Sequence, residues 1–289
     1  MRTAVIFGAN GQDGYYLSEL LQNEAVEVIA IGRNNASGVD ISNLDDVKAL
    51  VKEYKPDHIF HLAANSTTRH DTLFENHSTI STGTLNILEA VKSHSPLTKV
   101  FISGSGLQFK NRDLPIKETD EFEARDAYSV CRIQSVYAAR YFRMLGIKAY
   151  VGYFFNHDSP RRTSRHVAQM IAADVLAIEK GEEKIITIGD PSVKKEWGFA
   201  GDIVKAIWTL VEQDEVFEAN LGTGLGYSIQ EYIETCFDII NKDWKNHVQL
   251  KDGFKADYRQ LISDPSTILS LGWKPETSFE ALTKMMLHK

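Results

Sequence analysis

Short apolar runs rich in β-branched residues alternate with longer amphipathic stretches along the first half of the chain. The apolar runs predict strands over residues 3–7, 27–31, 57–62, 98–102 and 147–153. The stretches between them repeat apolar positions every three or four residues and predict helices near 12–23, 43–54, 75–93 and 126–145. Strands that alternate with helices form parallel sheets covered on both faces, because each crossover requires a helix. The pattern therefore predicts an α/β fold with a doubly wound parallel sheet, whose ligands bind at the carboxyl ends of the strands.

The pattern loosens after about residue 155. A polar segment at 156–162 leads into a helix that Gly181 ends and that has four apolar residues in register: Val167, Ile171, Val175 and Ile178. A strand at 184–188, a helix near 201–213 and a strand at 217–221 follow, and this last strand can rejoin the first sheet. Asp264 and Pro265 predict the N-cap and the first residue of a short helix that Gly272 closes. We therefore expect a smaller, mixed C-terminal lobe that forms one compact unit with the sheet.

Composition narrows the class of protein. The chain has 289 residues, of which 43% are hydrophobic and 25% charged, which is typical of a globular protein and excludes a disordered or fibrous one. Two cysteines are too few for a secreted disulfide scaffold, and the early apolar run is too short for a signal peptide. These features predict a soluble, cytoplasmic protein. A net charge of −7 argues against a nucleic-acid binder, so local geometry must hold any bound phosphate.

A glycine-rich loop follows the first predicted strand and opens the first predicted helix. Its glycines, at 8, 11 and 14, permit a tight turn and a close approach to a pyrophosphate. The helix N-terminus then offers unpaired N–H groups to the anion. We predict a dinucleotide site formed by Gly8, Asn10, Gly11, Gln12, Asp13 and Gly14. The alternative is an ordinary turn between strand and helix.

Residues after the second and third strands extend this predicted site. Arg33 stands where an acidic residue would bind a ribose 2′-hydroxyl, and an arginine there pairs with a 2′-phosphate, which favours NADP over NAD. The alternative for Arg33 is a solvated surface residue. Asp40 and Ile41 are candidates for the adenine side, although this segment also fits an N-cap. Leu62, Ala63 and Ala64 follow the third strand and are further candidate cofactor contacts.

Several motifs together resemble a known family. The GxxGxxG spacing, the Tyr128/Arg132 pair and the run 61–64 resemble the extended short-chain dehydrogenase/reductases, which have a Rossmann-type fold. The runs 11–14, 155–162, 195–198 and 271–275 are most similar to the GDP-mannose 4,6-dehydratase family within the NAD-dependent epimerases and dehydratases. The resemblance implies a nicotinamide cofactor, NADP with NAD as the alternative, and a nucleoside-diphosphate sugar substrate that is GDP-linked.

The resemblance also implies an organisation of domains and subunits. Residues 1–155, with 197–221 returning to them, form the dinucleotide-binding domain, and residues 156–196 and 222–289 form the nucleotide-sugar lobe. Helices 75–93 and 126–145 resemble those that pair subunits, which implies a homodimer or a tetramer. By motif position, the substrate-binding residues are Asn156, Arg162, Lys195 and Arg259. The Arg161–Arg162 loop is placed near a neighbour's cofactor, or else is a solvated basic turn.

The resemblance makes Tyr128 the proton-transferring group of the reaction. Tyr128 and Arg132 are four residues apart, so both face one side of a helix. A nearby cation lowers the pKa of a phenol, and Arg132 supplies that cation where the family usually has lysine. Arginine is larger and planar, so the contact with the nicotinamide ribose is altered. The alternative is a surface Tyr/Arg pair.

The loop after the fourth strand departs from the family pattern. The family has Ser or Thr at the position of Gly104, where its hydroxyl binds the sugar C4 oxygen, and Glu at the position of Gly106. Ser103 or Ser105 is the candidate for the hydroxyl role. The glutamate acts as the acid–base group for the elimination of water, and general acid–base catalysis is worth about 10²- to 10⁴-fold. Dehydration is therefore disfavoured.

These observations predict an NAD(P)-dependent oxidoreductase that acts at C4 of a nucleotide-linked sugar, most simply a GDP-linked 4-keto sugar reductase with Tyr128 as proton donor. One alternative is a dehydratase, or an epimerase that oxidises C4 and recycles its cofactor. Another is a catalytically degraded protein that binds nucleotide sugar or supports a partner. No metal site is expected, because His58 and His61 project to opposite faces of a strand. We expect neither a nucleic-acid nor a membrane partner.

Overall fold

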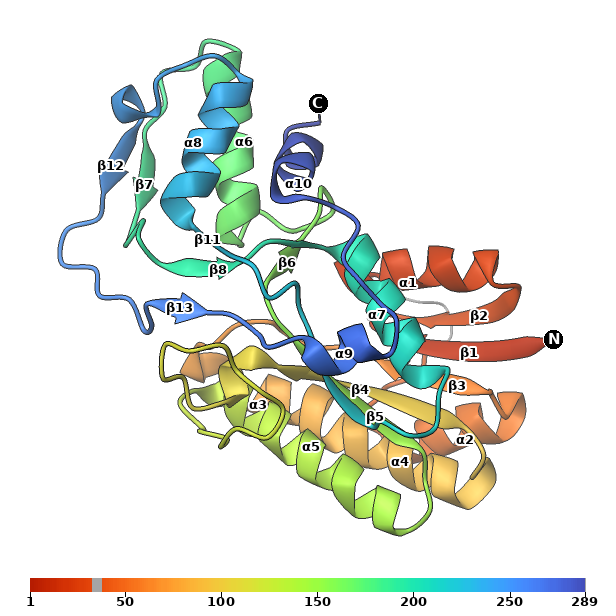
Figure 1. The fold of residues 1–289 in the computed structure, drawn as a ribbon. Coiled ribbons are helices and arrows are strands. Elements are labelled where there is room, and N and C mark those ends of the chain that lie inside the picture. Colours follow the sequence, from red (N-terminus) through yellow and green to blue (C-terminus); the bar gives the residue numbers. More distant parts are fainter. Residues whose placement is uncertain (33–37, 289) are drawn as a thin grey trace.

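A six-stranded parallel sheet forms the centre of the computed structural model, which describes residues 1–32 and 38–288. Its strand order is β10-β5-β4-β3-β1-β2 (Figure 1). The strands are β1 (Arg2–Phe7), β2 (Val26–Ile31), β3 (His58–His61), β4 (Lys99–Ser105), β5 (Ala149–Phe154) and β10 (Glu218–Leu221). β10 pairs with β5 in parallel, so the chain does return to the sheet after the second lobe begins. The predicted Rossmann-type fold is confirmed.

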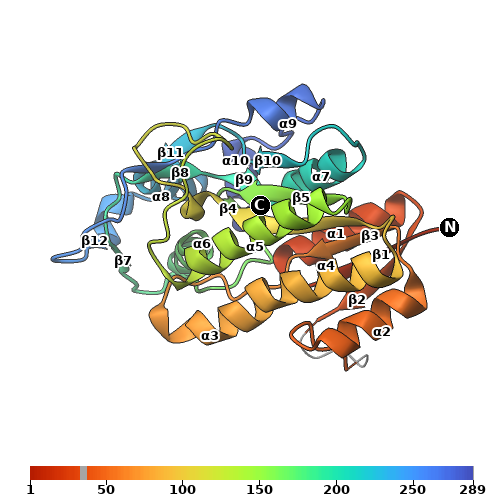
Figure 2. The same cartoon turned by 90° about the horizontal axis from the view of Figure 1, so that it is seen from below.

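Helices cover both faces of the sheet (Figures 1 and 2). α1 (Gln12–Asn23) and α7 (Ala200–Val211) lie on one face. α2 (Leu44–Tyr54), α4 (Gly83–His94) and α5 (Ala127–Met144) lie on the other. Each face of the sheet has its own hydrophobic core, and successive residues of a strand point to opposite cores. In β4, Val100 and Ile102 pack under α4 and α5, whereas Phe101 packs toward α7. This period of two fixes which side chains of each strand reach either layer.

The helix predicted at 75–93 is built from several pieces. A 3₁₀ turn, η1 (His70–Thr72), leads into α3 (Leu73–Asn76), and a π-helical segment, η2 (His77–Thr82), joins α3 to α4. The carbonyl of Ile80 in the π segment accepts a hydrogen bond from the Ser135 hydroxyl of α5, at 3.2 Å. It also lies 3.3 Å from His61 Nε2 at the end of β3. π segments are common at functional sites, and this one contacts the last residue of β3, His61.

The second lobe has its own core between α6 (Val167–Glu179), α8 (Ile229–Ile239) and α10 (Phe279–Met286). Trp197 stacks on Tyr232 at this centre, with ring centroids 4.1 Å apart. Around it lie the pairs β7 (Ile186–Ile188) with β12 (Val248–Leu250) and β6 (His157–Asp158) with β9 (Gly198–Phe199). A three-stranded sheet joins β11 (Gly226–Ser228), β8 (Lys194–Glu196) and β13 (Gln260–Leu261). Two 3₁₀ turns, η3 (Gly106–Gln108) and η4 (Trp244–Asn246), complete the elements apart from α9.

Two predicted helix starts are wrong by a few residues. α9 (Ser266–Ser270) has Pro265 at its N-cap, and the Asp264 carboxylate accepts the Ser266 N–H at 3.0 Å. α2 is capped by Asn43, whose side chain accepts two N–H groups, rather than by the segment at 40–42. Short polar side chains within a few residues of a helix start compete for the same N–H groups, so sequence leaves the choice open.

The short helix α9 also lies outside the predicted lobe. Ile268 and Trp273 pack in the core on the α1 and α7 side of the large sheet. The Trp273 indole N–H donates to the Asp202 carbonyl of α7 at 2.9 Å. The part of the chain around 264–275 therefore belongs with the sheet, although the prediction placed it in the nucleotide-sugar lobe.

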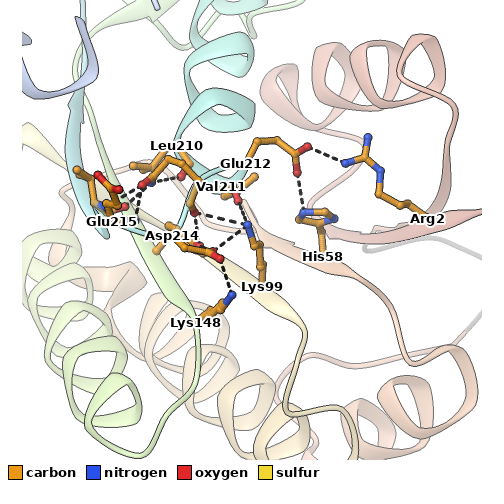
Figure 3. A network of polar contacts seen from close by, with 12 residues as sticks. Arg2, His58, Lys99, Lys148, Leu210, Val211, Glu212, Asp214 and Glu215 are labelled. Atoms are coloured by element: carbon orange, nitrogen blue, oxygen red, sulfur yellow. Dashed lines mark hydrogen bonds and ion pairs between the residues drawn. The ribbon is translucent and has the colours of Figure 1, made fainter. Parts of the chain in front are cut away.

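A polar network fixes the turn between α7 and β10 to the amino edge of the sheet (Figure 3). Glu212 pairs with Arg2 at 2.7 Å and lies 3.2 Å from His58 Nε2. Lys99 donates to the Val211 carbonyl at 2.7 Å and pairs with Asp214 at 3.1 Å. Three strands thus contact one turn, which holds the returning strand in register. In the part of the chain that the structure describes, no helix is long and apolar enough to cross a membrane.

Candidate active site

A cavity of about 470 Å³ opens at the carboxyl edge of the sheet, where the fold predicts a ligand. One wall is the glycine loop and the start of α1, and another is the end of β4 with the first turns of α5. The segment 154–163, with Arg165 and His166, closes the third side, and Tyr258 and Leu261 reach in from the second lobe. The two lobes thus share one cavity.

The glycine loop has no room for side chains at its tightest point. Gly8 has a φ of +93°, and a Cβ there would lie 2.7 Å from the Ala63 nitrogen. A Cβ on Gly14 would collide with the Gly8 carbonyl. Gly11 is the N-cap of α1 and provides no side-chain cap, so the first N–H groups of the helix remain open to an anion. The loop therefore fits a pyrophosphate.

The segment after β5 is fastened to the first turn of α1. His157 Nε2 lies 2.9 Å from an Asp13 carboxylate oxygen, and the Ser159 hydroxyl donates to Gln12 at 2.9 Å. Burial lowers the pKa of His157, but the Asp13 carboxylate outweighs it and the net shift is upward. Burial raises the pKa of Asp13, but His157 outweighs it and the net shift is downward. The pair is a buried ion pair that joins the cofactor loop to the second lobe. No motif in the sequence indicated it, because the two residues are far apart along the chain.

Most predicted cofactor residues lie at the cavity. Those that line it are Gly8, Gly11, Gln12, Asp13, Gly14, Leu62, Ala64, Tyr128 and Arg132. Ala63 contributes its backbone behind Gly8, and the Asn10 amide packs against Gly32. Asp40 instead caps its own turn by accepting from Ser42, and the Ile41 carbonyl accepts from Asn86, so neither is among the cavity residues. Arg33 lies outside the described residues.

Tyr128 and Arg132 reach the cavity from the first turns of α5. Asp126 caps this helix by accepting the N–H groups of Tyr128 and Ser129. The Arg132 guanidinium lies over the Tyr128 ring, 4.9 Å from its centroid. Its Nη1 donates to the Ser103 hydroxyl at 2.7 Å and to the Ser103 carbonyl. Arg132 is only 3% exposed, so a fixed positive charge is buried beside the phenol.

The two unusual glycines lie against aromatic rings. A Cβ on Gly104 would be 2.6 Å from Cδ1 of Tyr153, its cross-strand neighbour in β5. A Cβ on Gly106 would be 2.9 Å from Cε1 of Phe155. The aromatic rings of Tyr153 and Phe155 therefore occupy the space in which side chains at 104 and 106 would begin.

The predicted substrate residues separate into two groups. Asn156 and Arg162 line the cavity. The Asn156 Oδ1 is buried and has no hydrogen-bond partner among the described residues, so it is free to accept a hydrogen bond from a ligand. Lys195 is buried in the second lobe with its Nζ 4.7 Å from the Trp197 ring centroid, and Arg259 is exposed. Neither of the latter two is a cavity residue.

The cavity wall at 161–166 is strongly basic. Arg162 lies 3.5 Å from the Asp158 carboxylate, and the guanidinium carbon of Arg161 lies 3.5 Å from the Tyr15 ring centroid. Arg165 and His166 complete the wall, and burial together with Arg162 lowers the pKa of His166 to about 4. Sequence reasoning did not name Arg161 as a ligand of its own chain's cavity, nor Arg165 at all.

The histidines of β3 pack in the two cores. His61 is fully buried, and burial together with Arg132 lowers its pKa to about 3, so the ring is neutral. His58 lies on the other side, with its ring 5.1 Å from that of Trp208. Among residues 1–32 and 38–288, no three His, Cys, Asp or Glu side chains are grouped to hold a metal ion.

The sequence profile of the family described as "GDP-mannose 4,6 dehydratase" matches residues 34–286. The chain belongs to the GDP-mannose 4,6-dehydratase family. GDP-mannose 4,6 dehydratase 2 of Arabidopsis thaliana is 28% identical over 322 residues, which cover 100% of this chain and 86% of that protein. The human GDP-mannose 4,6 dehydratase is 29% identical over 335 residues, which cover 99% and 90%.

Solved structures confirm the fold. RMD from Pseudomonas aeruginosa, complexed with NADPH, superposes with a TM-score of 0.87 at 21% identity and covers 100% of this chain and 98% of its own. dTDP-glucose 4,6-dehydratase from Bacillus anthracis, in complex with NAD, gives 0.87 at 17% identity and covers 100% and 96%. The chain is thus a GDP-mannose 4,6-dehydratase family member with the architecture of nucleotide-sugar dehydratases and epimerases.

Proposed function

We propose that this protein is an NADP-dependent oxidoreductase acting at C4 of a nucleoside-diphosphate sugar, a GDP-linked 4-keto sugar reductase. One observation carries the proposal: the phenol of Tyr128 and the buried charge of Arg132 face the cavity, whereas positions 104 and 106 carry no side chain and abut aromatic rings. Reduction of a ketone needs one proton donor. Elimination of water needs a further acid–base group, which glycine cannot provide.

The cofactor is NADP, with NAD as the alternative, and the glycine loop with the N-terminus of α1 would hold its pyrophosphate. When bound in reduced form, it supplies a hydride to C4 of the sugar. Tyr128 gives its hydroxyl proton to the C4 oxygen, and water restores that proton. Arg132 stays protonated and stabilises the negative charge that develops on both oxygens.

The nucleotide sugar binds across the second lobe. We assign residues 1–155, with 197–221 and α9, to the cofactor domain, and residues 156–196 with most of 222–289 to the nucleotide-sugar lobe. Arg162 and Asn156 provide a cation and an amide for a diphosphate at the junction of the lobes. Lys195 and Arg259 do not line the cavity, and their role as substrate ligands stays a prediction.

The test is NADPH oxidation by the purified protein with a panel of GDP-linked 4-keto-6-deoxy sugars. We expect consumption of NADPH with formation of the 4-hydroxy sugar, and loss of about 10²-fold or more in Tyr128→Phe, which removes the proton donor. No oxidation with any keto sugar would refute the reductase. Loss of one water from GDP-mannose, measured by mass spectrometry, would establish the dehydratase instead.

A second candidate is a binding protein without turnover. It is favoured by Arg132, whose Nη1 is committed to both the hydroxyl and the carbonyl of Ser103. A titration of GDP-mannose and NADPH against Tyr128→Phe distinguishes the two candidates. Unchanged affinities together with no turnover of any sugar by the natural protein would select the binding protein.

We also propose a homodimer, with a tetramer as the alternative, formed through α4 and α5. Tyr137, Tyr141 and Met144 project from one side of α5 and are 58%, 57% and 85% exposed. Leu85 of the adjacent α4 is 49% exposed. α4 and α5 run side by side over one face of the sheet (Figure 2), and the exposed side chains of the two helices are our candidates for the subunit contact.

A further inference from the structure

We propose that the π segment η2 positions the phenol of Tyr128 in the cavity. His61 and Ser135 hold this segment in place through the carbonyl of Ile80, so both are positioning residues. The proposal rests on the proposed reductase function, in which Tyr128 gives its proton to the C4 oxygen. Neither His61 nor Ser135 lines the cavity, so each acts on the reaction only through the support of the phenol.

The Tyr128 ring belongs to a small apolar cluster that is separate from the large cores. Its other buried members are Ile80 of η2 and Cys131, which lies one turn further along α5. Partly buried side chains pack against this cluster from outside: Ala64, Leu73 and Leu107. Close-packed side chains transmit a displacement to their neighbours. A shift of Ile80 therefore moves the ring that carries the reacting hydroxyl.

The Ile80 carbonyl is held by side chains from two other elements. His61 Nε2, at the end of β3, lies 3.3 Å from this oxygen, and the Ser135 hydroxyl of α5 lies 3.2 Å from it. Within the helix, the Gly83 N–H is shared between the carbonyls of Ile80 and Ser78. The backbone of the π segment thus leaves the Ile80 carbonyl open to His61 and Ser135, which fix its position.

His61 is suited to this task because it is a buried, neutral donor. A carbonyl can only accept, so the Ile80 contact fixes the proton of the imidazole on Nε2. The side chain is fully buried, and its Nδ1 has no hydrogen-bond partner among the described residues. Burial together with Arg132 lowers the pKa of His61 to about 3, so the ring stays neutral. The backbone carbonyl of His61 accepts the Ser103 hydroxyl at 2.8 Å, which ties the same residue to β4.

Ser135 connects the π segment to the helix that carries Tyr128. Its hydroxyl lies 3.0 Å from the Cys131 carbonyl as well as 3.2 Å from that of Ile80. It also accepts the Thr84 hydroxyl of α4 at 3.1 Å. Ser135 is 1% exposed and lies two helical turns after Tyr128, on the same face of α5. One face of α5 therefore carries both the phenol and a bond that fixes its support.

The interface offers a bond of the same kind that does not reach the Ile80 carbonyl. The Ser81 hydroxyl of η2 donates to Gln134 Oε1 of α5 at 2.7 Å. Ser81 is 5% exposed, so its loss also removes a buried hydrogen bond between the same two elements. Ser81→Ala is therefore the matched control for a purely structural role.

Kinetics separate positioning from stability. Misplacement of a reacting group by about 1 Å costs on the order of 10²-fold in rate, so His61→Phe, which keeps a ring but removes the donor, should lower kcat about 10- to 10²-fold. Ser135→Ala should also lower kcat, and His61→Gln, which restores an N–H donor, should recover most of the loss. The KM for NADPH should stay within about twofold in all three variants, because the glycine loop is untouched.

Ser81→Ala should lower the melting temperature as Ser135→Ala does, but leave kcat within about twofold of the natural value. A loss of kcat in Ser81→Ala equal to that in Ser135→Ala would show that the interface is merely structural. Unchanged kcat in both His61→Phe and Ser135→Ala would also overturn the inference.

A spectroscopic measurement separates this inference from the proposed function. 3-Fluorotyrosine in place of Tyr128 reports the surroundings of the ring by its ¹⁹F resonance, whether or not the protein turns over a sugar. We expect this resonance to shift or broaden in His61→Phe and in Ser135→Ala, to return with His61→Gln, and to stay in place in Ser81→Ala. If the natural protein reduces no keto sugar, the reductase fails, and the resonance still tests the support. A resonance that is the same in His61→Phe, Ser135→Ala and the natural protein would refute the role of the π segment.

Discussion

Arg132 provides more hydrogen-bond donors to the site than a lysine would, and its Nη1 donates to Ser103. Arg132→Met keeps much of the apolar stem and removes the charge beside Tyr128. We expect kcat for keto-sugar reduction to fall about 10²-fold or more, since fixed charge at a developing oxyanion is worth several kcal/mol. Steady-state kinetics with NADPH measure this. Arg132→Lys is the matched control, because it keeps the charge; a loss as large as that of Arg132→Met would show that donor geometry matters rather than charge.

The His157–Asp13 pair predicts a pH dependence of stability. The folded pKa of His157 lies above its ordinary value of 6.5, so its contribution is full below pH 6.5 and is lost as pH rises through the folded pKa. The pKa of Asp13 is lowered, so its contribution is present above pH 3.8 and is lost in acid. Between about pH 6 and pH 9, the free energy of unfolding should fall more steeply for the natural protein than for His157→Asn.

Denaturant titrations across that pH range check the slope. His70→Asn is the control, because the His70 side chain is exposed, whereas that of His157 is buried. A slope for His157→Asn equal to that of the natural protein would show that His157 is neutral in the folded state throughout.

Single residues of the site were predictable to different degrees. The glycine loop and the Tyr128/Arg132 pair were predictable from local sequence. The positions of their residues relative to one another depend only on one loop or on one helical turn. The choice between Ser103 and Ser105 remained open, since it depends on the His61 carbonyl and on Arg132, which come from other elements. Arg33, on which the choice of NADP rests, lies outside the described residues.

At the scale of elements, Lys99 holds the turn between α7 and β10 from inside the sheet. It is 19% exposed on its side chain and binds the Val211 carbonyl as well as Asp214. Lys99→Met should lower the free energy of unfolding by about 1–3 kcal/mol, because it leaves the Val211 carbonyl without its charged donor and removes one of the two lysines paired with Asp214. Activity should be retained, since this turn lies at the edge opposite the cavity.

Lys148→Met is the matched control for Lys99→Met. Lys148 pairs with the same Asp214 at 2.7 Å but is 41% exposed, and exposed ion pairs contribute less than about 1 kcal/mol. Urea denaturation compares the two variants. Equal losses would mean that the Val211 carbonyl bond contributes nothing.

Strands and helices with a clear period were predicted well, and joints between them were not. Apolar spacing decides that β1 is a strand and that α5 is a helix, because burial on one face selects the period. The π segment at His77–Thr82 has no such signal, since it inserts a residue into a helix whose apolar face continues. The run at 156–162 was predicted only as a polar segment before a helix, whereas it contains the strand β6. Its bonds to Gln12 and Asp13 are tertiary contacts.

At the scale of the whole molecule, the exposed apolar side of α5 predicts self-association. Tyr141→Glu places a charge at the centre of that surface and should convert the dimer to a monomer, as measured by light scattering after size exclusion. Tyr54→Glu is the control, because Tyr54 is 43% exposed but belongs to α2 and not to the helices α4 and α5 of the proposed contact. A natural protein that is monomeric at all concentrations would refute the proposed dimer.

The chain has a net charge of −7, but the lining of the cavity is positively charged. Among the described residues, four arginines line the cavity, at 132, 161, 162 and 165, whereas the one acidic side chain among them that lines it, Asp13, is paired with His157. The remaining acidic residues lie elsewhere in the described chain. The charge of the whole molecule therefore says little about its ligand, whereas the cavity favours phosphates.

The contact between Tyr153 and position 104 limits which residues can stand at 104. A Cβ at 104 and the Tyr153 ring, 2.6 Å apart, cannot coexist in this arrangement. Glu218 holds the Tyr153 hydroxyl and is itself paired with Arg140, so the ring is fixed at its far end. A single substitution that adds a side chain at 104 therefore costs stability unless residue 153 changes with it, and the two positions are constrained to vary together.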